Sequence, residues 1–180
     1  MCLGALQQRL SSVSVFTSVA VYHGNIYAAG FTTDDRTVVY VFKQSGDGWH
    51  KAYSFKVTSD SWVTISVQNN VIKCCSRRKD KIMVYDLTGK HLRTYGAHGT
   101  DDAGEFNSPY ICADGDEGSL LLADNWNQRL QVMRLNGECR VLQLQPPAFG
   151  HRSAAMFKND LYLTTFHAGS NGVLYRYRCT

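Results

Sequence analysis

Short apolar runs separated by tight polar turns recur along the whole chain. Four of these turns stand between two apolar runs, at Gly24-Asn25, Asn69-Asn70, Glu117-Gly118 and Asn159-Asp160. The runs are rich in β-branched and aromatic residues, and none has the period of a convincing amphipathic helix. Each turn therefore predicts a β-hairpin whose two strands are joined by a short connection.

The hairpins repeat at a nearly constant interval. The apolar residues that follow the turns are Ile26, Ile72, Leu120 and Leu161, so the successive intervals are 46, 48 and 41 residues. A third strand is expected after each hairpin, and a fourth after the first three. Strands that repeat about every 40 to 50 residues are typical of the blades of a β-propeller. The sequence therefore predicts an all-β propeller with four detectable blades, near residues 17–55, 62–96, 106–144 and 151–178.

The residues before the first blade, 1–16, form a leader that contains one more strand candidate. Leu10–Phe16 has a strand-like pattern, whereas the fourth blade has only three predicted strands. A strand from the N-terminus can pair with the last blade and remove an exposed sheet edge. Two arrangements stay open: a closed four-bladed ring completed by Leu10–Phe16, or residues 17–180 as part of a larger propeller. The second arrangement predicts self-association through uncovered edges.

Composition and charge limit the kinds of partner. The 180 residues are 44% hydrophobic and 12% aromatic, which suits a folded core rich in strands. The 19 Lys and Arg exceed the 15 Asp and Glu by four, a balance that allows an anionic partner but is weaker than in typical nucleic-acid modules. The six Cys form no C-x-x-C pair, and neither a signal peptide nor a long apolar run is present. We therefore expect a cytoplasmic location, with neither membrane nor DNA as a partner.

The most regular motif of the chain surrounds the third predicted blade. Asp86, Gly89, Tyr95-Gly96 and Gly99 are followed by Gly104-x-Phe106-x-x-Pro109, by Asp114 and by Ala123-Asp124-x-x-Asn127-x-Arg129-Leu130-Gln131-Val132. This stretch resembles the NHL repeat, the blade unit of NHL-type β-propellers. It is most similar to the C-terminal propellers of tripartite-motif (TRIM-NHL) E3 ubiquitin ligases. The resemblance implies a propeller that binds protein substrates or RNA through one face, typically with six blades.

Asp124, Asn127 and Arg129 occupy the corner between two predicted strands of this blade. Asp and Asn side chains satisfy the backbone groups of turns by local hydrogen bonds. The guanidinium of Arg129 has the donors to pair with Asp124 or with a carbonyl of a neighbouring blade. We interpret Asp124 and Asn127 as a structural corner, with direct ligand contact as the alternative.

A basic run occupies the equivalent corner of the second blade. Four cations stand there within five residues: Arg77, Arg78, Lys79 and Lys81. They are candidates for binding a phosphate backbone or an acidic protein segment, with a solvated loop as the alternative. Trp126 and Arg129, at the matching corner of the next blade, are expected beside them on the same face. Cations beside an exposed aromatic ring suit single-stranded nucleic acid, whereas a Trp126 packed between blades would be structural.

The predicted function is an interaction module that binds a protein partner through its propeller loops. By resemblance this is the substrate-recognition part of a TRIM-NHL type ubiquitin ligase. RNA binding through a basic propeller face is one alternative, and a metal-dependent propeller hydrolase or lyase is a second. The six histidines have no metal-ligand spacing, and no known catalytic motif is present. We expect no metal or other cofactor, and we expect that the chain is not an enzyme.

Overall fold

The computed structural model of the chain describes residues 13–46, 48–57, 62–144, 151–158, 160–165 and 172–178. Within these ranges the regular elements are β-strands, apart from the single turn of 3-10 helix η1 (Asp116–Gly118). The described ranges contain no helix with the length and apolarity needed to cross a membrane. The chain is therefore all-β, as predicted.

Four antiparallel sheets follow one another along the chain, each with its strands in sequence order. The first contains β1 (Val13–Tyr22), β2 (Asn25–Thr32), β3 (Thr37–Ser45) and β4 (Gly48–Lys56). The second contains β5 (Val63–Gln68), β6 (Val71–Ser76), β7 (Lys81–Asp86) and β8 (His91–Tyr95). The third contains β11 (Pro109–Asp114), β12 (Leu120–Asp124), β13 (Arg129–Met133) and β14 (Cys139–Leu142). The fourth contains β15 (His151–Phe157), β16 (Asp160–Thr165) and β17 (Val173–Arg178).

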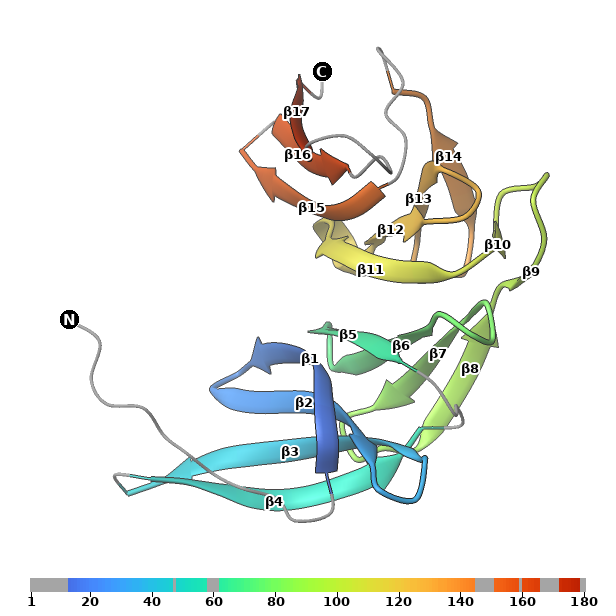
Figure 1. Ribbon diagram of the computed structural model, residues 1–180. Coiled ribbons are helices and arrows are strands. Elements are labelled where there is room, and N and C mark those ends of the chain that lie inside the picture. The colour runs from blue at the N-terminus through green and yellow to red at the C-terminus, as the bar shows by residue number, and fades with distance from the viewer. Residues whose placement is uncertain are drawn as a thin grey trace.

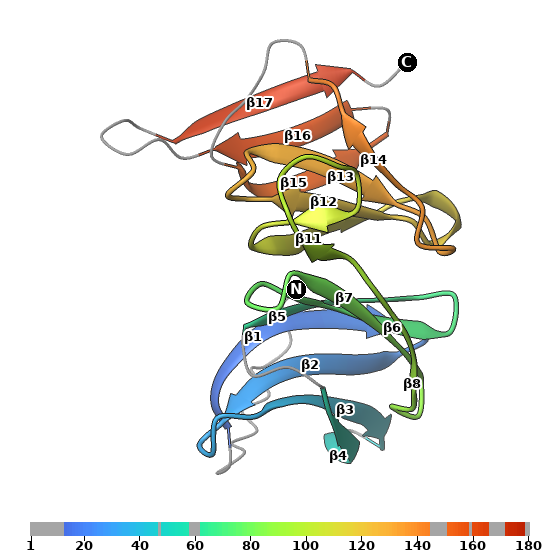
Figure 2. The ribbon, with the colours of Figure 1, turned by 90° about the vertical axis from the view of Figure 1, so that its right-hand side faces the viewer.

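The sheets are arranged as successive blades (Figures 1 and 2). The first strand of each sheet lies innermost, because β1 packs on β5, β5 on β11, and β11 on β15. A short parallel pair, β9 (Ala97–His98) and β10 (Glu105–Phe106), lies in the connection between the second and third sheets. The first and fourth sheets form the two ends of the series (Figure 1). This is the arrangement of a β-propeller, and it is consistent with part of a larger ring.

The hairpin turns have residues that suit their backbone. His23 (φ 46°) and Gly24 (φ 70°) join β1 to β2, while Asn69 (φ 52°) and Asn70 (φ 60°) join β5 to β6. Two successive positive φ angles make the two-residue turn that matches the twist of a hairpin, and Gly and Asn adopt them at low cost. The first turn is one residue earlier than expected, since Asn25 already belongs to β2.

Apolar side chains fill the spaces between successive sheets. The two middle sheets have apolar residues on both faces, and a neighbouring sheet covers each of these faces. In β6, Ile72 and Cys74 belong to the core shared with the first sheet, and Cys75 belongs to the core shared with the third. Leu121 of β12 and Leu163 of β16 lie in the core between the third and fourth sheets.

The structure corrects the role expected for the end of the leader. Val13–Phe16 does not complete the fourth sheet but forms the start of β1, where Val15 pairs with Phe31 and Phe16 with Gly30 of β2. Shifts in the pairing register on both sides of Val15 and Phe16 let this long strand bend while it stays paired. The beginning of the predicted closing strand, before Val13, lies outside the described residues.

Candidate binding face

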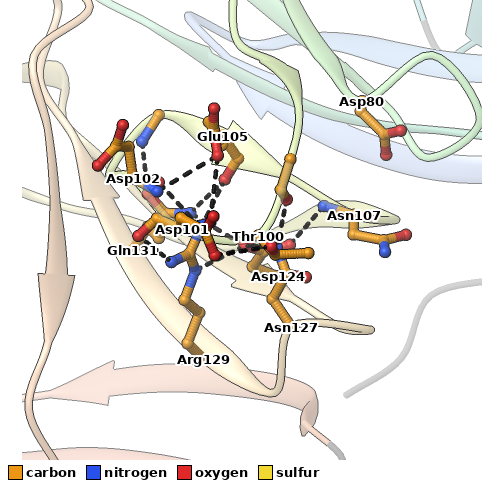
Figure 3. Close-up of polar contacts among 12 residues, drawn as sticks. Asp80, Thr100, Asp101, Asp102, Glu105, Asn107, Asp124, Asn127, Arg129 and Gln131 are labelled. Atoms are coloured by element: carbon orange, nitrogen blue, oxygen red, sulfur yellow. Dashed lines mark hydrogen bonds and ion pairs between the residues drawn. The ribbon is translucent and has the colours of Figure 1, made fainter.

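The corner between β12 and β13 is built around a buried carboxylate. Asp124 has no exposed surface and accepts hydrogen bonds from four groups (Figure 3). Its Oδ1 accepts from the backbone N–H of Asn107 at 2.7 Å. Its Oδ2 accepts from Asn127 Nδ2 at 2.8 Å, Arg129 Nε at 2.9 Å and Gln131 Nε2 at 3.0 Å. A carboxylate buried in a protein requires this degree of satisfaction, so Asp124 organises the whole corner.

Arg129 ties the same corner to the connection between the second and third sheets. Its Nη2 donates to the carbonyls of Asp102 at 2.9 Å and Glu105 at 3.0 Å, and its Nη1 donates to the carbonyl of Asp101 at 3.3 Å. The Arg129 side chain is 14% exposed. The structure thus places this predicted ligand-binding residue inside the corner, where the fold uses its donors.

The equivalent corner of the second sheet has a different arrangement. β6 ends at Ser76 where β12 ends at Asp124, and β7 begins at Lys81 where β13 begins at Arg129. Position 76 provides no carboxylate to hold the side chain of Lys81, which is exposed. The sequence difference between the two corners therefore moves a cation from the interior of the corner to its surface.

The dipeptide Asn107-Ser108 is bound by both corners. In the third-sheet corner, the N–H of Asn107 donates to Asp124, and the carbonyl of Asn107 accepts from the N–H of Trp126 at 3.1 Å. The N–H of Ser108 donates to Oδ1 of Asp80 at 2.7 Å, and the hydroxyl of Ser108 accepts from Nε of Arg77 at 3.2 Å. Since Asp80 and Arg77 lie in the turn between β6 and β7, the two corners are side by side on one face.

Aromatic and cationic side chains are exposed on this face, which we call the corner face. Trp126 is 70% exposed, so it is not packed between blades, and Arg78 and Lys79 are exposed as well. Trp62, just before β5, is 60% exposed, and its carbonyl accepts from the N–H of Arg77. A cleft of about 170 Å³ lies here, lined by Thr17, Trp62, Val63, Thr64, Arg77 and Tyr110. The sequence reasoning missed Trp62, whose one signal was a large aromatic residue ahead of a strand.

Charge is unevenly distributed over the corner face. The cations belong to the turn of the second sheet, whereas Asp101, Asp102 and Glu105 lie in the connection held by Arg129 (Figure 3). Asp101 and Asp102 are exposed, and their backbone N–H groups donate to Oε2 of Glu105. A long polyanion that crossed both corners would therefore meet carboxylates at the third sheet.

Histidine and cysteine side chains do not assemble into a metal site in the described ranges. No group of three or more His, Cys, Asp or Glu there could hold a metal ion. His98 Nδ1 lies 2.7 Å from Oδ2 of Asp80, beside the second corner. Burial raises the pKa of the Cys74 and Cys75 thiols well above the usual range and that of Cys112 to about 12. These thiols pack as small apolar groups.

The fold is shared with solved structures of low sequence identity, and no protein-family model matches the chain. A protein of unknown function from Bacteroides caccae superposes with a TM-score of 0.68 and 12% identity over 91% of this chain. Virginiamycin B lyase from Staphylococcus aureus gives 0.61 and 12% over 94%, and the Dos1 propeller gives 0.57 and 14% over 82%. At such identities the likeness shows the fold, a β-propeller, and leaves the resemblance to TRIM-NHL propellers a prediction.

The comparisons correct the expectation that the chain is not an enzyme. That expectation rested on the absence of local catalytic motifs. Virginiamycin B lyase is an enzyme by its name, and its fold matches nearly the whole of this chain. A propeller can bring side chains together from separate blades, and one fold hosts many functions, so a missing local motif is no argument against catalysis.

The matches cover most of this chain but a smaller share of the longer proteins. The chain spans 63% of the Bacteroides protein, 56% of the lyase and 38% of the protein that contains the Dos1 propeller. Its four described sheets thus correspond to part of those longer chains. We conclude that this polypeptide has the β-propeller fold.

Proposed function

We propose that the chain binds an acidic segment of a protein partner on the corner face. The proposal rests on the position of Asn107-Ser108, which forms hydrogen bonds with both corners. These bonds hold the cations of the second-sheet corner beside the exposed Trp126 of the third-sheet corner. By its resemblance to TRIM-NHL propellers, the chain would be the substrate-recognition part of a ubiquitin ligase of that type.

The residue types on the corner face support a protein partner. Trp and Arg are the side chains most enriched at the energetic centres of protein interfaces. Arg77 lines the cleft together with two aromatic residues, Trp62 and Tyr110. A carboxylate of the partner would accept hydrogen bonds from the terminal nitrogens of Arg77, while the carbon chain beside it packs on the aromatic rings.

RNA is the competing ligand, and the charges of the corner face weigh against it. Exposed Trp126 offers a stacking surface, and Arg77, Arg78 and Lys79 offer cations for phosphates. The acidic connection held by Arg129 adjoins that surface at the third sheet, however, and would repel a phosphate backbone that crossed both corners. A short acidic protein segment needs only the cations of the second-sheet corner, the aromatic cleft and Trp126, and does not have to cross the acidic connection.

The test is a binding measurement on a synthetic array of twelve-residue acidic peptides and on a twelve-nucleotide single-stranded RNA. The best peptide is titrated against the wild-type chain, Arg78→Glu and Trp126→Ala. Lys90→Glu is the matched control, since it makes the same change of charge at an exposed position in the β7–β8 connection, at the opposite end of β7. We expect each corner variant to bind at least about tenfold more weakly, roughly 1.4 kcal/mol, and the control to bind as the wild type does.

The outcomes separate the two ligands. Peptide binding that neither Arg78→Glu nor Trp126→Ala weakens would overturn the corner face as the site. If instead the RNA binds and the peptides do not, the protein proposal fails in favour of RNA. Three phosphate contacts would then give a slope near −2 in a plot of log affinity against log salt, from about −0.7 per contact for a single strand.

A further inference from the structure

The first sheet has one covered face and one open face, and the open face is apolar along β1 and β2 but has exposed Lys51 and Lys56 on β4. Residues such as Ala29 and Val39 pack on the second sheet. The opposite side, which we call the outer face, contains Phe16, Val19, Val21, Ile26, Ala28 and Phe42. On it Val19 is 66% and Val21 is 68% exposed. Single exposed apolar residues are common in proteins, but a group of them on one sheet face, here Phe16, Val19 and Val21, marks an interaction surface.

The outer face corresponds position by position to a buried face of the second sheet. Val21 pairs with Ile26 next to the β1–β2 turn, just as Val67 pairs with Ile72 next to the β5–β6 turn. The matching positions are Val19 and Ile65, Val21 and Val67, Ile26 and Ile72, and Ala28 and Cys74. In the second sheet these four residues are at most 6% exposed, because the first sheet covers them. Along β1 and β2, the outer face therefore has the composition of a face that another sheet covers.

The shape of the outer face also fits a covering sheet. It has a hollow of about 470 Å³, lined among others by Phe16, Val19, Ile26, Phe42 and Trp49. Its lining combines large side chains with the small side chain of Ala28. Side chains from two packed sheets interdigitate in such spaces, so a second sheet about 10 Å away would fill it.

The other end of the series has a different chemistry. On the fourth sheet Leu174 is 65% exposed, but Arg176 and Arg178 in the same strand are charged and contact Asp160. Their side chains are 56% and 75% exposed. Covering them with the apolar outer face of another copy would remove these cations from water at a large cost. Contact between two outer faces that is centred on β1 and β2 buries apolar surface against apolar surface instead, and it leaves Lys51 and Lys56 of β4 at the rim, in water.

We propose that two copies of this chain associate through the outer faces of their first sheets, related by a twofold axis. Strands of eight to ten residues make this sheet about 30 Å long, and four strands make it about 19 Å wide, which gives roughly 570 Å² of planar area. Accessible surface exceeds planar area on a face with projecting side chains. With β1 to β3 as its apolar centre and β4 as its polar rim, the outer face thus approaches the roughly 800 Å² that each partner buries in a standard interface.

The test is the solution mass of the full 180-residue chain across a hundredfold range of concentration. The wild type is expected at twice 20.2 kDa, with a mass that falls on dilution. Val19→Lys places a charge on β1, in the most exposed apolar part of the outer face, and is expected to raise the dimer dissociation constant at least a hundredfold. Because Val19 is already mostly exposed, its substitution leaves the monomer folded, which circular dichroism and a urea titration would check.

Leu174→Lys is the matched control, since it makes the same kind of change at a 65% exposed apolar residue of the fourth sheet. We expect it to dimerise as the wild type does. A wild type that stays at 20.2 kDa at every concentration overturns the proposal. If Leu174→Lys dissociates the dimer as strongly as Val19→Lys, copies join end to end through the first and fourth sheets, and the twofold contact is wrong. A dimer that resists Val19→Lys also refutes it.

Discussion

Replacement of Asp124 by Asn should destabilise the chain far more than its size suggests. Asn keeps the shape of the side chain but replaces one carboxylate oxygen with an amide that donates. All four groups around Asp124 are donors: the N–H of Asn107, and the side chains of Asn127, Arg129 and Gln131. In either orientation the new amide therefore faces at least one donor, and Arg129 loses its counter-charge.

The magnitude follows from the burial of the pair. A hydrogen bond to a charged group contributes about 1.5–3 kcal/mol, and removing one partner of a buried ion pair costs about 3–5 kcal/mol. The Arg129 side chain keeps 14% exposure and can recover some hydration, so we place the loss at the lower end, about 3 kcal/mol. A domain is stable by only about 5–15 kcal/mol in total.

The assay is urea unfolding of the wild type, Asp124→Asn and Glu138→Gln, followed by circular dichroism. Glu138 is the matched control, because it makes a carboxylate–arginine pair with Arg134 in which both side chains are more than 60% exposed. Surface pairs contribute about 0–1 kcal/mol, so this variant should unfold almost as the wild type does. If Asp124→Asn costs less than about 1 kcal/mol, or no more than Glu138→Gln, the buried carboxylate does not hold the corner together.

Three further outcomes are expected. Gly96→Ala should cost about 2–3 kcal/mol in urea unfolding, because Gly96 has φ 88° and an added Cβ would lie 2.6 Å from the Phe106 ring. Gly24→Ala, at φ 70° but with open space around the added Cβ, should cost about 1 kcal/mol. Equal costs for the two variants would contradict the argument from packing. The Cys75 thiol, buried with a raised pKa, should react with a thiol reagent at neutral pH only after unfolding, and rapid reaction of this thiol in the native chain, located by peptide mapping, would contradict its burial. Burial lowers the pKa of Lys73, so the folded chain releases this proton at a lower pH than the unfolded chain does. The free energy of unfolding of the wild type, relative to that of Lys73→Met, should therefore rise as the pH increases toward 10.5. Parallel plots of this free energy against pH for the two proteins would refute the prediction.

The fold was predictable because its signals are local. Turn residues and apolar alternation located the hairpins around Ile26, Ile72 and Leu120, and their interval indicated a propeller. The end of the leader was not predictable, because a strand-like run such as Val13–Phe16 suits any sheet edge. Only the pairing with β2 decides which edge it takes.

The candidate site was predictable in part, for a different physical reason. Spacing alone placed the two corners at equivalent positions, since each follows the second strand of its sheet. Exposure was not encoded in the same way. Arg129 and Lys81 occupy matching positions, yet the Arg129 side chain is mostly buried and the Lys81 side chain is exposed. The difference comes from the residue five positions earlier, which is the carboxylate Asp124 before Arg129 and the hydroxyl Ser76 before Lys81. Trp62 lies beside this face only through contacts distant in sequence.

The shared attachment of Asn107-Ser108 has a consequence for how the chain folds. A row of blades behaves approximately as a linear array, in which each unit is stabilised by itself and by its nearest neighbours. The hydrogen bonds that Asp80 and Asp124 accept from this dipeptide add to the interaction free energy between the second and third sheets. These two blades should therefore exchange their amide hydrogens as one cooperative unit, the last to open, with the first and fourth sheets fraying from the ends of the array.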